Sequence, residues 1–184
     1  MAISSKRLIA LLVLLSPAAA LACLNGVFLE KNEAAKLVAK VEKMLDEGKA
    51  RLAFNTVPPE FEVDNQALNV RLQLLQAVAR ARMGKARATI PTLREILSWK
   101  SDDPYRRARL AEALVSANQS PKEALGILAD LETRDLMPDA EGWAALARLR
   151  AAQKDTAGRD RALAKCKAVA KRAEVCQIEG PGTT

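Results

Sequence analysis

The chain has 184 residues and a formal net charge of +7, and it contains no histidine. The lack of histidine removes the commonest general base, the commonest metal ligand and the usual partner of a nucleophilic serine or cysteine. Only 3% of residues are aromatic, a composition that favours packed helices over sheets. We therefore expect an all-α, non-enzymatic protein without cofactor or metal. The alternative of a different class is a hydrolase or transferase using lysine, serine or glutamate.

Residues 1–22 have the composition and order of a secretory signal peptide. Lys6 and Arg7 precede an apolar run, Pro17 interrupts it, and small residues follow up to Ala22. The apolar stretch is shorter than the roughly 20 residues that a transmembrane helix needs. We predict export to the periplasm or cell envelope, with cleavage between Ala22 and Cys23.

The residues before Cys23 leave two outcomes open. Ala20-Leu21-Ala22 is a suitable site for simple cleavage. The same residues with Cys23 also resemble the bacterial lipobox, although Ala20 stands where that motif prefers leucine. The resemblance implies an outer-membrane lipoprotein attached through acyl chains on Cys23. In either case residues 23–31 form an N-terminal segment before the helical part of the chain.

Residues that start or end helices divide residues 32–172 into eight expected helices, followed by a C-terminal tail at 173–184. Glycine and proline mark the helix ends, and short polar residues mark the starts. The expected spans are 32–46, 49–56, 64–83, 87–98, 103–118, one opening at Ser120, 139–154 and one opening at Thr156. The expected capping residues are Asn32, Asp64 or Asn65, Asp103, Ser120, Asp139 and Thr156.

These helices share a repeating register. Equivalent sites in the first helix of each hairpin lie 36, 34 and 36 residues apart, at Val41, Ala77, Ala111 and Ala147. Seven residues after each comes a turn position: Gly48, Gly84, Asn118 and Lys154. Recurring apolar positions follow in the second helices: Val57, Leu93, Leu128 and Leu163, then Ile96, Leu131 and Cys166. A period of this length indicates a repeat architecture in which each hairpin buries its apolar face against the next.

Between residues 33 and 170 the chain resembles the tetratricopeptide repeat (TPR) family. The large-small pairs Leu110-Ala111 and Leu146-Ala147, the segment Glu123-Ala124-Leu125 and the aromatic Trp143 carry this resemblance. It implies a right-handed α-solenoid of about four helix-turn-helix repeats that binds peptides or protein segments along a concave face lined by first helices. Another α-solenoid or an irregular helical bundle stays open as an alternative.

The resemblance also implies a set of groove-facing side chains. The family's spacing, transferred to this chain, gives Arg71, Arg82, Tyr105, Glu112, Glu141 and Arg148. For each of these residues the alternative is an ordinary solvated helix face.

Charge is concentrated in the middle of the chain. Residues 66–111 contain ten basic and three acidic groups, a net charge of +7. The basic residues lie around one turn (Arg80, Arg82, Lys85, Arg87) and at the next helix start (Arg106, Arg107, Arg109). We predict a basic patch across the second and third hairpins that attracts an acidic peptide or anionic envelope polymer. Export and the scarcity of aromatic side chains weigh against nucleic acid as the partner.

Cys166 and Cys176 are candidates for a disulfide. A continuous helix would hold them about 15 Å apart, whereas a disulfide needs Cα atoms at roughly 5.5 Å. Pairing therefore requires the last helix to end near Lys171-Arg172 and the chain to fold back. The alternative is that Cys166 is a free cysteine in the core. Together these patterns predict a protein–protein interaction scaffold of the bacterial cell envelope.

Overall fold

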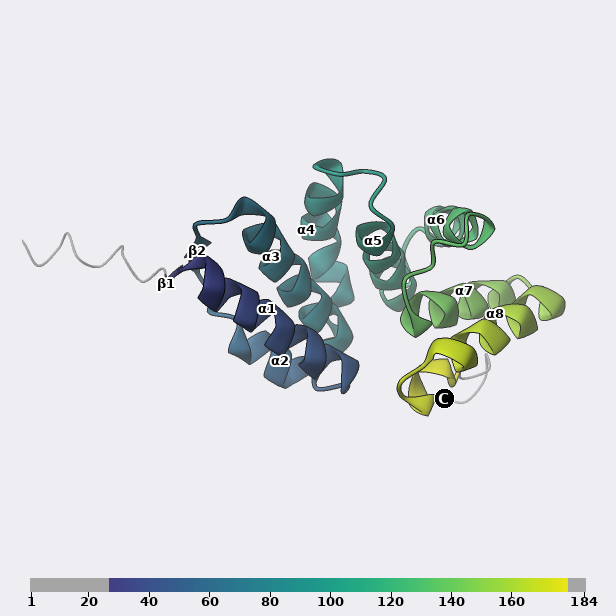
Figure 1. Cartoon of the computed structure of the whole chain (residues 1–184). Helices are drawn as coiled ribbons and strands as arrows, with labels where there is room; N and C mark the ends of the chain where they lie inside the picture. The colour runs from purple at the N-terminus through teal and green to yellow at the C-terminus, as the bar shows by residue number, and fades with distance from the viewer. Residues whose placement is uncertain (1–26, 179–184) are drawn as a thin grey trace, which may run out of the picture.

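The computed structural model describes residues 27–178, and its eight α-helices follow the expected order along the chain (Figure 1). The helices are α1 (Lys31–Asp46), α2 (Ala50–Thr56), α3 (Gln66–Arg80), α4 (Ala86–Ser98), α5 (Pro104–Ser116), α6 (Pro121–Thr133), α7 (Ala140–Ala152) and α8 (Thr156–Val169). A kinked segment, η2 (Ala81–Lys85), joins α3 to α4 with a non-helical backbone at Gly84, and a 3-10 turn, η3 (Ala173–Cys176), follows α8. The predictions on the signal peptide, Ala22 and Cys23 fall outside the described residues.

The helices pack as hairpins that stack in chain order. Each helix contacts the next one, and the first helices α1, α3, α5 and α7 also contact one another in succession. The stack curves into an arch with α1 and α2 at one end and α7 and α8 at the other (Figure 1). Among residues 27–178, no helix has both the length and the hydropathy needed to cross a membrane.

The recurring apolar positions form the contacts between the helices. Val41, Ala111 and Ala147 have no exposed surface, and Ala77 is 7% exposed. These small side chains let neighbouring helices approach closely. The recurring positions of the second helices are also buried at Val57, Leu93, Leu128, Ile96, Leu131 and Cys166, while Leu163 is partly buried. The predicted core register is therefore confirmed.

All four predicted turn positions adopt left-handed backbone conformations. Their φ angles are 75° at Gly48, 83° at Gly84, 49° at Asn118 and 63° at Lys154. The next amide often reaches back to the last helical turn, as in the bonds from Lys49 N to Met44 O and from Asp155 N to Arg150 O. This arrangement satisfies carbonyl groups that the helix end leaves without partners. The same corner thus recurs with the sequence period.

Lys154→Gly is expected to stabilise the protein by about 0.5–1 kcal/mol, because glycine adopts a positive φ without the steric cost that Lys154 incurs. Urea denaturation measures the change. Lys165→Gly is the matched control, since Lys165 lies exposed inside α8 and its replacement should cost about 1 kcal/mol. Destabilisation by both variants would contradict the strain at Lys154.

Three of the predicted helix caps are confirmed and three are wrong. The side chains of Asn65, Asp103 and Asp139 accept hydrogen bonds from the first turns of α3, α5 and α7. Ser120 makes no such bond because its backbone is left-handed, whereas a cap needs an extended backbone. The remaining two corrections are that Asp155 caps α8 in place of Thr156, and that α1 begins before Asn32.

A two-stranded sheet departs from the all-α prediction. Strand β1 (Val27–Leu29) pairs in parallel with β2 (Phe61–Val63), so that the segment before α1 is fastened to the segment after α2. Each strand has three residues. A stretch of this length is too short for alternation to distinguish it from a loop. The protein is nevertheless mostly helical.

The predicted disulfide between Cys166 and Cys176 is confirmed. Helix α8 ends at Val169, and the chain folds back so that the two Cα atoms lie 5.8 Å apart. Turn η3 packs against α7 and α8. The segment that follows α8 is thereby held against the body of the protein.

Candidate functional site

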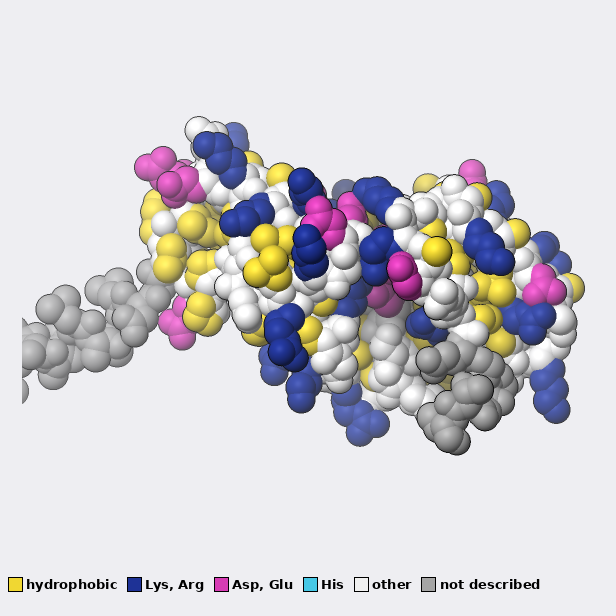
Figure 2. All heavy atoms as spheres, turned by 90° about the horizontal axis from the view of Figure 1, so that it is seen from below, with side chains coloured by type: hydrophobic (Ala, Val, Ile, Leu, Met, Phe, Trp, Pro, Cys, Tyr) yellow, Lys and Arg dark blue, Asp and Glu magenta, His cyan; other side chains and the backbone are white. Residues whose placement is uncertain are grey.

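A cleft of about 330 Å3 lies on the inner side of the arch. Each of the four first helices contributes to its walls: Glu42 from α1, Arg71 from α3, Tyr105 from α5 and Glu141 from α7. Figure 2 looks at the open side of the arch, and basic and acidic side chains lie next to one another along the middle of that face. The cleft therefore draws on all four hairpins.

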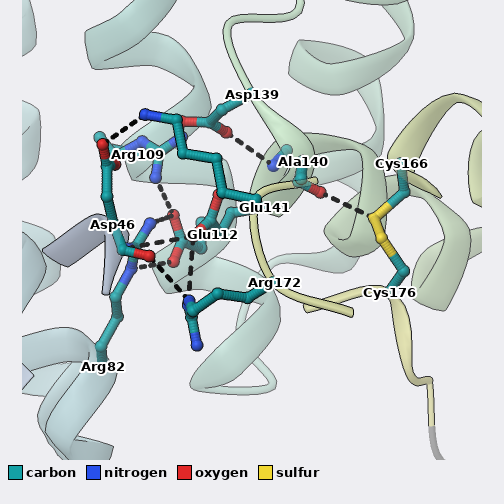
Figure 3. Close-up of polar contacts among 12 residues, drawn as sticks. Asp46, Arg82, Arg109, Glu112, Asp139, Ala140, Glu141, Cys166, Arg172 and Cys176 are labelled. Atoms are coloured by element: carbon teal, nitrogen blue, oxygen red, sulfur yellow. Dashed lines mark hydrogen bonds and ion pairs between the residues drawn. A yellow bond between two sulfur atoms is a disulfide. The ribbon is translucent and has the colours of Figure 1, made fainter. Parts of the chain in front are cut away.

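A network of ion pairs lies along one wall of the cleft and beside it (Figure 3). Arg109 is buried, with 1% of its side chain exposed, and its guanidinium pairs with Glu112 at 2.6 Å and with Asp139. Arg82 pairs with Glu112 at 3.0 Å and with Glu141 at 3.3 Å. These contacts connect η2, α5 and α7, so the network fixes how the second, third and fourth hairpins sit against each other.

Arg71 extends this network to the first hairpin. Its Nε and Nη2 atoms donate hydrogen bonds to Glu42 Oε1 at 2.8 Å and 2.6 Å. The Arg71 guanidinium also lies over the ring of Tyr105, 4.1 Å from its centroid, and Arg109 approaches the same ring at 4.9 Å. Tyr105 therefore stacks with two cations, which stabilises the contact between α3 and α5.

The network keeps its members charged. Burial opposes ionisation of Glu112, but the guanidinium groups of Arg109 and Arg82 outweigh it and hold the pKa of Glu112 below its usual range. Burial likewise opposes the charge on Arg109, yet Glu112 and Asp139 raise its pKa further above the ordinary value. The pKa of Tyr105 is raised, mainly by burial. None of these shifts moves a group towards neutral pH.

The lowered pKa of Glu112 predicts an acid-sensitive contribution to folding. A carboxyl group with a lowered folded-state pKa stabilises the protein above its unfolded pKa of 4.5, and this contribution disappears as pH falls through the folded value. Glu112→Gln should therefore be less stable than wild type at pH 7, and the difference should shrink in acid. Urea denaturation from neutral to acid pH tests this, with the exposed Glu95→Gln as control. A pH-independent difference would contradict it.

The segment after α8 also lines the cleft. In this C-terminal clamp (residues 170–176), Lys171 Nζ donates to Asp46 Oδ2 at 2.6 Å and Arg172 Nε donates to the Asp46 carbonyl at 2.8 Å. Arg172 also lies 3.7 Å from Glu141. A Cβ atom at Gly48 would lie 2.5 Å from Arg172 Nη1, so a larger residue in this turn would have to displace the end of the Arg172 side chain, and the φ angle of 75° also favours glycine. The Cys166–Cys176 disulfide holds the clamp in place (Figure 3).

No family model, curated protein or solved structure matches the chain. Within residues 27–178, no group of three or more potential ligands could hold a metal ion.

The structure brings together most of the side chains that the repeat spacing assigned to a groove. Arg71, Arg82, Tyr105, Glu112 and Glu141 all lie in or beside the cleft. Arg148 does not, because it is exposed on α7 and lines a separate cavity of about 330 Å3 between α5 and α7. Sequence reasoning missed Glu42, Asp46, Lys171 and Arg172, whose partners lie far away in the chain.

Four of the seven basic side chains of the predicted patch are engaged within the protein. Arg109 is buried in the ion-pair network, and Arg82 is paired with two carboxylates. Arg106 donates to the Ile96 carbonyl at 2.9 Å, and Arg107 pairs with Asp130 at 2.6 Å. These side chains bind neighbouring helices of the same chain, because arginine offers several donors to acceptors across a helix contact. Of the predicted patch, Arg80, Lys85 and Arg87 are exposed.

Proposed function

We propose that this protein is a non-enzymatic protein–protein interaction scaffold of the bacterial cell envelope, built as a TPR-like α-solenoid that holds an extended segment of a partner in its cleft. The observation that carries the proposal is a cleft to which the first helix of every hairpin contributes. A recess with walls from successive hairpins suits a ligand that runs along the stack.

The repeated helix corners support the solenoid part of the proposal. Four left-handed turn residues recur with the sequence period, and the small residues seven positions before them are buried. Helices also pack in chain order. These features are typical of arrays in which each repeat contacts its neighbours.

The chemistry of the cleft favours binding over catalysis. A general acid or base works best with a pKa near the operating pH. The pKa of Glu112 is lowered and the pKa of Arg109 is raised, so both move away from neutral pH, because each group is paired with opposite charges. Next to these pairs, the cleft offers apolar surface from Val169, which is 52% exposed, and from the partly buried Val175. A partner segment with aliphatic side chains and little net charge fits such a lining.

The cysteines support export. Disulfides persist in oxidising compartments. The Cys166–Cys176 bond and the signal-like N-terminal sequence therefore both favour the periplasm or envelope. A lipid on Cys23 would tether the same scaffold to the outer membrane. Incorporation of labelled palmitate that is lost in Cys23→Ala separates the two forms.

Site-specific photo-crosslinking tests the binding site. A photoreactive amino acid at Val169, which lines the cleft and is 52% exposed, should give a discrete adduct in cells that naturally produce the protein. Trp99 is the control position, because it is 53% exposed at the end of α4 and does not line the cleft. The captured partner, once purified, should bind Val169→Glu at least tenfold more weakly than Trp99→Glu. Equal adducts at both positions, or none at Val169, would contradict the proposal.

A further inference from the structure

A second groove lies on the face of α3 that points away from the cleft. It has a volume of about 590 Å3 and is bounded by α2, α3 and α4. Helix α3 contributes Arg71 and Leu75 to the cleft but Gln73, Gln76 and Arg80 to this groove. At 100° per residue these two sets occupy opposite faces of the helix. The groove is therefore independent of the cleft.

The lining of this groove combines an apolar floor with side-chain amides. Apolar surface comes mainly from Phe54, Pro59 and Ala88, with the largely buried Val57 and Ala77 beneath them. Asn55 and Gln73 add amide groups, each with both a donor and an acceptor, and Gln76 adds an acceptor, since its Nε2 donates to the Pro58 carbonyl at 3.4 Å. An extended polypeptide presents the same two groups along its backbone. The lining can thus bind a main chain while the floor receives an aliphatic side chain.

One end of the groove is basic, and its charge has no partner among the described residues. Arg80 lines the groove, and Lys85 lies one turn before Ala88 and Thr89 on the same face of the chain entering α4. Arg51 lies one turn before Phe54 and Asn55 on α2, which contacts both α3 and η2.

All three basic side chains are exposed, and none forms an ion pair within residues 27–178. The nearest acidic residues along the lining segments are Glu60, next to Pro59, and Glu95, one turn beyond Thr92. Glu95 lies towards the opposite end of α4 from Lys85, and Glu60 follows α2 at the end remote from Arg51.

We propose that this groove is a second docking site, which binds an extended acidic segment of a partner protein. An aliphatic side chain of that segment enters the apolar floor, its backbone pairs with the glutamine and asparagine amides, and its carboxylates face Arg51, Arg80 and Lys85. Charge complementarity selects the occupant, since the basic end attracts carboxylates and repels basic segments. The cleft does not compete for such a ligand, because its own acidic and basic groups are paired with each other.

Peptide binding tests the proposal directly. The probe is a fluorescent octapeptide library in which Asp or Glu alternates with Val or Leu, and the matched library has Lys at the acidic positions. We expect binding of acidic members only, weakened at least tenfold by the double variant Arg80→Glu/Lys85→Glu and by Ala88→Trp, which fills the groove. In NMR spectra, bound peptide should shift the side-chain amide signals of Asn55, Gln73 and Gln76.

The matched control reverses two exposed charges on another hairpin. Arg161→Glu/Lys165→Glu on α8 changes the net charge by the same amount and should leave peptide affinity unchanged. Circular dichroism verifies that each variant is folded. Failure of every acidic member to bind, or equal weakening by both double variants, would overturn the proposal. Variants that abolish peptide binding in this groove should leave crosslinking at Val169 in the cleft unchanged. The docking proposal and the proposed function can therefore be refuted independently.

Discussion

Replacing Arg109 by alanine is expected to lower the free energy of unfolding by about 3–5 kcal/mol, the cost typical of breaking a buried ion pair from one side. The Arg109 side chain is 1% exposed, and its guanidinium pairs with both Glu112 and Asp139. Its removal leaves these carboxylates close together with Arg82 as the nearest remaining cation of Glu112. Urea denaturation at pH 7 measures the loss.

A compensating variant separates the lost charge from the lost volume. Arg109→Met/Glu112→Leu keeps the site filled and removes both charges, so it should recover more than half of the stability that Arg109→Ala loses. Asp139 keeps its second role in that variant, because its Oδ1 accepts the hydrogen bond that caps α7. The exposed Arg161→Ala should change stability by less than about 0.5 kcal/mol. A loss below about 1 kcal/mol in Arg109→Ala would contradict the role assigned to the network.

Reduction of the Cys166–Cys176 bond, or its removal in Cys176→Ala, should cost about 2–3 kcal/mol, the loop-closure value for a ring of this size. The same change should release the C-terminal clamp, since its Lys171 contact to Asp46 is exposed and weak by itself. Hydrogen exchange is the direct readout. Amides of residues 170–176 should exchange faster, as should those at the end of α1, while α5 stays protected.

Reductant provides the control for this prediction. It should destabilise wild type to the level of Cys176→Ala and leave that variant unaffected. Unchanged exchange at residues 170–176 after reduction would mean that the disulfide is not what holds the clamp.

Local patterns predicted the helices and their register. Apolar period, glycine and proline act within a few residues, so the sequence alone located the corners at Gly48 and Lys154 and the buried sites at Ala111 and Ala147. Ser120 does not cap its helix because its own backbone is left-handed, which the local residue pattern did not reveal. The β1–β2 pairing was not predicted from the sequence, because a contact between two three-residue segments depends on the fold that brings them together.

The candidate site was only partly predictable, for a similar reason. The groove-facing spacing implied by the family resemblance placed Arg71, Arg82 and Glu141 on one side of the stack. It could not reveal that these charges pair with each other, because partners such as Glu42 and Arg71 lie 29 residues apart. The burial of Arg109 was unforeseen, because arginine is rarely buried unless carboxylates surround it.

The clamp gives this stack a property that open helical arrays lack. In an ordinary array each terminal unit touches one neighbour only, so melting can begin at either extremity and travel inward. Here Lys171 and Arg172 join the last hairpin to Asp46 in the first, across 125 and 126 positions of sequence. Fraying at one extremity therefore removes a support from the other, and loss of structure at the two extremities is linked.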